Sequence, residues 1–133
     1  MLDDLIAWQL AHAFKLEVYR LLREHAAARA DLRFRDQLQH AAASVGINIA
    51  EGFHRYGRRE FSRFLSIALA SLGEAPLWLR DGIDRRHFTE AECTDAFTLA
   101  KRCRVASLRL KHSLSHPKHL KHPTHPPSRT QRT

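Results

Sequence analysis

Apolar residues recur at steps of three and four along most of the chain, which is the spacing that aligns side chains on one face of an α-helix. Four segments have this pattern, at about residues 5–25, 31–53, 57–80 and 89–114. Four of the five prolines lie at or after Pro117, so little interrupts helices before that point. β-Branched residues are sparse, which leaves strands without support. The pattern predicts an all-α fold, an antiparallel up-down four-helix bundle over residues 1–114.

The first predicted helix is apolar over more of its circumference than one contact surface requires. With about 100° between successive residues, one face carries Leu10, Phe14, Val18, Leu21 and Leu22. An adjoining face carries Leu5, Trp8, Leu16 and Tyr19. Together these faces form an apolar arc of roughly 240°, whereas a surface helix of a globular protein needs about 100°. We therefore expect this helix to pack against its own core and against a second subunit, which predicts a homo-oligomer.

Glycine and proline mark where the middle helices begin and end. Asp31 is a suitable N-cap for the second helix, and Gly52 suits the position just after its end, where a left-handed backbone is favoured. Gly57 stands where the third helix begins. Pro76 lacks an N–H group and disfavours helical geometry at the residue before it. We therefore predict a kink or a break over residues 73–76, after which helical turns resume.

The fourth predicted helix starts at a capping box. Thr89 and Glu92 have the T-x-x-E spacing in which each side chain accepts a hydrogen bond from the other residue's backbone N–H. The apolar stripe that follows contains Cys93, Ala96, Phe97, Ala100, Cys103, Ser107, Leu110 and Leu114. Both cysteines of the chain lie on this stripe, so we expect them to be buried as small apolar side chains rather than to act as nucleophiles.

A polar cluster is predicted where the second and third helices meet. Glu51 sits at the negative end of the second helix, which is unfavourable for a carboxylate by about 0.3–1 kcal/mol. An antiparallel hairpin places Asn48 level with Arg63 and brings Arg63 beside Glu51. We predict that Glu51 accepts hydrogen bonds from Arg63 or from the first free N–H groups of the third helix; direct ligand binding by Glu51 is the alternative. The cluster is interpreted as a structural motif of Gln37, Ser44, Asn48, Glu51, Gly52, Arg63, Ser71 and Glu74.

The positive charge of the chain is concentrated in its last third. The formal net charge is +8, from 22 Lys and Arg against 14 Asp and Glu. Residues 96–133 contain nine of these cations and no acid, so the preceding residues are close to neutral. A basic segment of this kind suits a polyanion such as RNA, and a solubilising tail is the alternative. The predicted phosphate-contacting residues are Lys101, Arg102, Arg104, Arg109, Lys111, Lys118 and Lys121, with a second patch at Arg58, Arg59 and Arg63.

The end of the chain, HPKHLKHPTHPPSRTQRT, differs in character from the rest. Its composition predicts a disordered basic tail over residues 115–133. Histidines recur at every third position, at 116, 119, 122 and 125, and polyproline II has three residues per turn. In that conformation the imidazoles would line one edge and bind a metal ion or a phosphate, which is the alternative interpretation.

No motif in the sequence supports catalysis. Glu51 and His54 form one Glu-x-x-His, but a di-iron bundle needs two such motifs and two further glutamates. No glycine-rich phosphate loop is present. We therefore predict a protein that is not an enzyme and that holds no cofactor and no metal ion in its bundle.

The sequence also bears on where the protein acts. It contains no run of about 18 apolar residues that would span a membrane. The first residues, MLDDLIAW, are acidic where a signal peptide is basic. Two cysteines do not make a disulfide framework. These features predict a cytoplasmic protein without a membrane partner.

Three blocks of the sequence resemble a bacterial family of four helix bundle proteins, also described as proteins encoded by intervening sequences in 23S ribosomal RNA. Residues 36–55, DQLQHAAASVGINIAEGFHR, are similar to its D-Q-x-x-R-A-x-x-S-I-x-x-N-I-A-E-G signature. Residues 59–74, REFSRFLSIALASLGE, are similar to its K-E-F-x-x-F-L-x-x-A-x-G-S-x-x-E block, and residues 7–21 resemble its opening. The departures from the family pattern are His40, Gly46, Gly57, Ala70 and Pro76.

The resemblance implies a four-helix bundle that assembles as a ring, a homopentamer. Related proteins include the accessory factor of diversity-generating retroelements, which works with a reverse transcriptase and binds RNA or DNA through a basic surface. By this resemblance the chain is expected to be a non-enzymatic, nucleic-acid-binding accessory factor. A scaffold for a protein partner is the competing hypothesis, and metal binding through the His-rich tail is a third.

Overall fold

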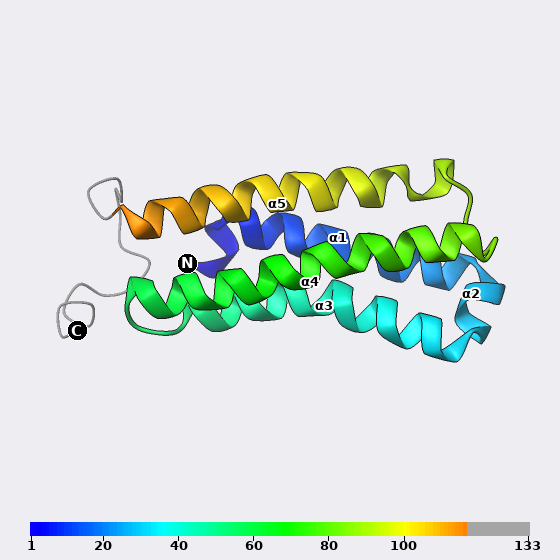
Figure 1. Cartoon of the computed structure of the whole chain (residues 1–133), viewed down its shortest axis with the longest axis horizontal. Helices are drawn as coiled ribbons and strands as arrows, with labels where there is room; N and C mark the ends of the chain where they lie inside the picture. Colours follow the sequence, from blue (N-terminus) through cyan, green and yellow to red (C-terminus); the bar gives the residue numbers. More distant parts are fainter. Residues whose placement is uncertain (117–133) are drawn as a thin grey trace.

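The computed structural model describes residues 1–116, apart from the side chain of Asp4. The four long helices are α1 (Ile6–Glu24), α3 (Leu32–Phe53), α4 (Arg58–Asp84) and α5 (Thr94–Ser115) (Figure 1). The shorter elements are the five-residue α2 (Ala26–Ala30) and the 3-10 turns Leu2–Asp4 and Ala91–Cys93. No strand occurs among the described residues, so the predicted all-α fold is confirmed. Lys118, Lys121 and the histidines after His116 lie outside the described residues.

The four long helices form one bundle. α1 packs against α3 and α5, and α4 packs against the same two helices. Successive long helices run in opposite directions, and α2 turns the chain from α1 into α3 (Figure 1). The two neighbours of α4 in the bundle are therefore α3 and α5. No helix within residues 1–116 is long and apolar enough to cross a membrane.

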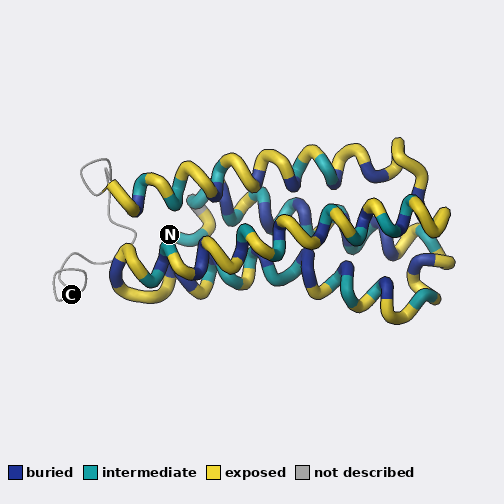
Figure 2. Tube along the Cα trace, viewed as in Figure 1, coloured by how far each residue is buried: buried dark blue, intermediate teal, exposed yellow. Residues whose placement is uncertain are grey.

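The core lies between the helices along their whole length (Figure 2). Each long helix contributes side chains without exposed surface, such as Phe14 on α1, Ile49 on α3, Leu65 on α4 and Cys103 on α5. Burial of one large apolar side chain contributes about 1.5–3 kcal/mol. The helices are thus held by continuous apolar stripes rather than by their own propensity.

The wide apolar arc of α1 is divided between the core and the surface. Val18 and Leu21 are fully buried, whereas Ile6 and Leu16 are 59% and 49% exposed. Trp8 is half-buried and lies beside Gly46 of α3: a Cβ atom at Gly46 would lie 3.7 Å from the indole nitrogen. In a single chain, part of this arc therefore faces solvent.

Gly52 does not follow the end of α3 as predicted. The helix continues to Phe53, and Gly52 is buried within it. A Cβ atom at Gly52 would lie 2.8 Å from Cβ of Phe64 and 2.9 Å from Cδ1 of Phe61, so glycine lets α3 approach α4 closely. The left-handed backbone occurs at Gly57, with φ of 94°, where the chain turns into α4 as expected.

Pro76 does not interrupt α4. The helix is continuous from Arg58 to Asp84, so the predicted break over residues 73–76 is wrong. An internal proline costs a helix about 3 kcal/mol. The buried residues Leu72, Ala75 and Leu79 surround this position and pack into the core. Tertiary packing therefore outweighs the local preference of the proline.

Candidate nucleic-acid interface

Three cations form one row on α5. Lys101, Arg104 and Lys111 are separated by three and seven residues, spacings that keep side chains on the same side of an α-helix. The row extends about 15 Å along the helix axis. Within residues 1–116 none of the three forms an ion pair, and α5 contains no acid after Asp95. We call these three residues the basic row.

The basic row faces the side of α5 that packs on α4. Phe97 precedes Lys101 by one turn, and the guanidinium of Arg80 from α4 lies 4.6 Å from its ring. Ser115 follows Lys111 by one turn, and it borders a hollow together with residues of α4. Phe97 and Ser115 lie beyond the two ends of the row on the same side of α5, and both are next to α4, which places the cations between them along the α4–α5 boundary.

The other two cations predicted on α5 lie elsewhere on the helix. Arg102 and Arg109 are seven residues apart and share a second row. Successive residues of a helix differ by about 100°, so Arg102 points away from Lys101. Both arginines are exposed, and neither forms an ion pair among the residues that the structure describes. The five cations of α5 therefore form two rows rather than one patch.

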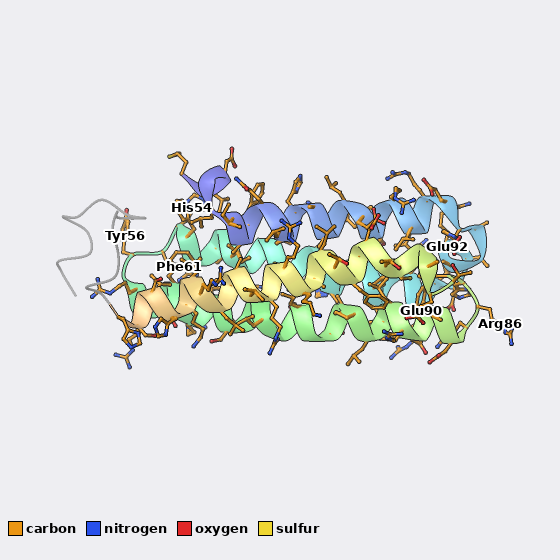
Figure 3. All side chains as sticks on the ribbon, turned by 90° about the horizontal axis from the view of Figure 1, so that it is seen from above. His54, Tyr56, Phe61, Arg86, Glu90 and Glu92 are labelled. Atoms are coloured by element: carbon orange, nitrogen blue, oxygen red, sulfur yellow. The ribbon has the colours of Figure 1, made fainter. Side chains whose placement is uncertain are left out.

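A hollow of about 660 Å³ lies where α4 begins and α5 ends. Its walls include Tyr56, Gly57, Arg58, Arg59, Ser62 and Ser115. Arg58 and Arg59 are exposed and form no ion pair within the described part of the chain. Tyr56 extends outward from the α3–α4 turn at this end of the bundle (Figure 3). At the hollow, Arg58 and Arg59 of the predicted second patch lie next to the end of α5 that follows the basic row.

Arg63 belongs to a charge-balanced cluster and not to this surface. Its Nε lies 3.2 Å from Glu60, while Arg55 lies 3.0 Å from Glu51 and 3.9 Å from Glu60. The predicted pair between Glu51 and Arg63 is therefore wrong. Glu51 is bound by Arg55 one turn later on the same segment, and its side chain is half exposed. The hydrogen bond from Arg63, followed by the charges of Arg63 and Arg55, lowers the pKa of Glu60.

The register between α3 and α4 differs from the predicted one. Ser71 Oγ donates to Ser44 Oγ at 2.8 Å, which fixes which turns of the two helices meet. In this register Gly52, rather than Asn48, lies opposite the turn that carries Arg63 and Phe64. The sequence expectation was displaced by about one turn because the α3–α4 loop does not bisect the hairpin evenly.

The polar motif predicted between α3 and α4 is only partly connected. Asn48 Nδ2 donates to Ser44 Oγ at 3.0 Å, so Ser44, Asn48 and Ser71 form one network. Glu74 lies apart and accepts from the indole N–H of Trp78 at 3.0 Å. Gln37 is half-buried two turns before Ser44. This hydrogen-bond network connects α3 to α4 and therefore has a structural role.

Two histidine–carboxylate pairs at the opposite end of the bundle were not predicted. His25 lies 3.0 Å from Glu92, and His87 lies 2.9 Å from Asp31. Glu92 also completes the predicted capping box, since its backbone N–H donates to Thr89 and its carboxylate accepts from Thr89 N. Asp31 occupies the predicted N-cap position of α3, but its side chain makes no capping hydrogen bond there. The histidines come from distant turns that no local pattern connects to these acids.

The described residues offer little for catalysis or metal binding. Cys93 and Cys103 are fully buried, as predicted, and desolvation raises the pKa of each thiol to about 11. A nucleophilic cysteine needs the opposite shift. Within residues 1–116 no group of three or more His, Cys, Asp or Glu is placed to hold a metal ion. The histidine repeat lies almost wholly outside this range.

Comparison with known proteins identifies similar chains. The family model of the 23S rRNA-intervening sequence protein matches residues 3–106. A crystal structure of a protein of unknown function from the S23 ribosomal protein family of Bacteroides thetaiotaomicron superposes with a TM-score of 0.60 at 19% identity, covering 84% of this chain and 97% of that chain. At this identity the likeness supports the fold alone. No curated protein matches the chain.

Proposed function

Because the chain belongs to the family of 23S rRNA-intervening sequence proteins, we propose that it is a cytoplasmic, non-enzymatic accessory protein that binds RNA through its phosphates. The observation that carries the proposal is the basic row Lys101, Arg104 and Lys111, which continues into Arg58 and Arg59 at the hollow. Cations without ion pairs keep their full charge for a ligand, whereas exposed pairs such as Glu60–Arg63 are already neutralised.

The α4–α5 boundary carries few acids where the cations gather. α4 has no acid between Glu60 and Glu74, and these two acids bind Arg63 and Trp78 on the same helix. A phosphate backbone that follows this boundary would therefore meet cations and hydroxyl groups, together with one carboxylate, Glu60, that is already paired with Arg63. Contacts of this kind position a nucleic acid but do not read its sequence, so we propose RNA binding without base specificity along the row.

A homo-oligomer, a homopentamer by the family resemblance, forms part of the proposal. Its support is the exposed apolar surface of α1, where Ile6 and Leu16 are 59% and 49% exposed. Several copies of the basic row on one particle would add their affinities for one RNA. Light scattering coupled to size-exclusion chromatography measures the assembly directly, and a monomeric mass at micromolar concentration would contradict it.

Fluorescence anisotropy of a labelled structured RNA tests the function. The variant Lys101→Gln/Arg104→Gln/Lys111→Gln removes the basic row, and Arg23→Gln/Arg33→Gln/Arg86→Gln removes the same charge from the far end of the bundle, where Arg86 projects outward (Figure 3). The row variant should bind at least about tenfold more weakly, and the control should stay near the wild type. Equal affinity for all three chains would reject the proposal.

Protein binding is the second candidate, and the outer faces of α3 and α4 favour it. Ile47 and Leu77 are 64% and 68% exposed on these helices. A scaffold that binds through such side chains would respond weakly to salt, because apolar contacts do not release counterions. An RNA-binding surface would respond steeply, so the salt dependence separates the two candidates.

A further inference from the structure

An aromatic ring stands among the cations of the hollow. Tyr56 is 45% exposed at the α3–α4 turn and borders the hollow together with Arg58 and Arg59. The turn is fixed on both sides, since α3 ends at Phe53 and Gly57 adopts the left-handed backbone that starts α4. The ring is therefore held beside the cations by a defined backbone and not on a long loop.

The one carboxylate at the hollow does not repel an anion strongly. Glu60 is bound by Arg63, with hydrogen bonds of 3.2 Å to each of its oxygens, and Arg55 lies 3.9 Å away. These two guanidiniums also cover the ring of Phe64, at 4.5 and 4.9 Å. The charge of Glu60 is thus balanced mainly by Arg63 and Arg55, with a smaller contribution from Arg59, while Arg58 and Arg59 form no ion pair within the described residues.

We propose that the hollow binds an unpaired nucleotide of a single-stranded nucleic acid, with the base stacked on Tyr56 and the phosphate held by Arg58 and Arg59. The proposal rests on the proposed function and assigns its substrate class. The volume of about 660 Å³ lies within the range of about 300–1,000 Å³ that small-molecule sites occupy. An aromatic face beside cations is the combination that single-stranded nucleic acids use, because every base has a π-face.

Whether a nucleic acid can bind in the hollow depends on whether its bases are paired. In a duplex the faces of the bases are covered by their neighbours, so Tyr56 has no base to stack on unless one is turned out. The basic row contacts phosphates, which both single strands and duplexes possess. The row therefore binds either form, and the hollow adds affinity only for a strand that offers an unpaired base.

Two labelled probes test the inference on the full chain: a short single-stranded RNA, and a blunt RNA duplex with the same number of phosphates. Tyr56→Leu removes the ring, and Tyr56→Phe is the matched control that keeps it. Tyr56→Leu should weaken single-strand binding by about tenfold and leave duplex binding unchanged, while Tyr56→Phe should bind both probes like the wild type. A single-stranded DNA of the same sequence shows whether the hollow prefers RNA.

The outcomes separate this inference from the proposed function. If Tyr56→Leu leaves single-strand binding unchanged, or weakens both probes equally, the nucleotide site is rejected while salt-dependent binding by the basic row stands. If the wild-type chain binds neither probe at low salt, the proposed function is rejected and the nucleotide site with it. Thermal unfolding followed by circular dichroism confirms that each variant is folded, which an exposed turn residue should permit.

Discussion

Ser71 on α4 donates a hydrogen bond to Ser44 on α3 over 2.8 Å, and Asn48 donates to the same Ser44 hydroxyl over 3.0 Å. The first bond joins the two helices and the second lies within α3, and all three side chains are partly buried. The bond between Ser71 and Ser44 fixes the register in which Gly52 lies against Phe64.

Ser71→Ala removes the bond between the helices. The free energy of unfolding should fall by about 0.5–1.5 kcal/mol, the usual net value of one hydrogen bond. Urea denaturation measures the change. The control is Ser66→Ala, because Ser66 is exposed on the same helix and bonds only to the Ser62 carbonyl. If the two variants lose the same stability, the joint between Ser44 and Ser71 is not significant.

Gly52→Ala and Gly73→Ala should change stability in opposite directions. Alanine favours a helix over glycine by about 0.8–1 kcal/mol, and a Cβ atom at Gly73 would have nothing within 4 Å. At Gly52 the same atom would lie 2.8 Å from Cβ of Phe64, so α3 and α4 must separate, at about 1–3 kcal/mol. Thermal unfolding should show a higher Tm for Gly73→Ala and a lower Tm for Gly52→Ala. A stabilised Gly52→Ala would disprove the close approach.

Pro76→Ala should stabilise the protein. α4 is continuous through Pro76, so alanine would restore one backbone N–H and remove the clash with the preceding turn. The free energy of unfolding should rise by up to about 3 kcal/mol, measured by urea denaturation. A loss of stability would mean instead that the proline ring makes contacts that alanine cannot replace.

The pair His25–Glu92 should make stability depend on pH. The hydrogen bond to Glu92 raises the pKa of His25 above its ordinary value of 6.5, so this stabilisation is complete below pH 6.5 and is lost as pH rises through the raised pKa. The bond to His25 lowers the pKa of Glu92 below 4.5, so its contribution is present above pH 4.5 and is lost as pH falls through the lowered pKa. The pair therefore stabilises the fold most between about pH 4.5 and about pH 6.5.

His25→Gln should remove this dependence. From about pH 6 to about pH 8 the Tm of the wild type should fall by more than the Tm of the variant. His40→Gln serves as the matched control, because His40 is exposed on α3, and it should follow the wild type. Parallel curves for His25→Gln and the wild type would show that the pair does not contribute.

The features that could be read from the sequence are those whose partners lie within one or two turns. The capping box of Thr89 and Glu92 was predicted because three residues separate its members, and the buried stripe of α5 was predicted by its spacing. Pro76 misled the prediction because the local cost of a proline is visible in the sequence, whereas the packing that overcomes it is not.

The sequence predicted which cations belong to the candidate site but not how they are arranged in space. The sequence pointed to the cations of α5 and to Arg58, Arg59 and Arg63 as separate patches. Only the packing of α5 on α4 joins the basic row to Arg58 and Arg59, whereas Arg63 pairs with Glu60 three residues earlier on the same helix. No sequence pattern singled out Tyr56, because a single aromatic residue in a turn has no periodicity. Its proposed role depends on the cations that the fold places beside it.

The salt dependence of RNA binding tests the central claim most directly. For a chain that ends at residue 116, the logarithm of the affinity for a single-stranded RNA should fall against the logarithm of salt with a slope of about 3.5. This value follows because each phosphate neutralised contributes about 0.7, and the basic row with Arg58 and Arg59 supplies five cations. A slope near zero, or binding that disappears entirely with the residues after 116, would contradict an RNA-binding surface on the bundle.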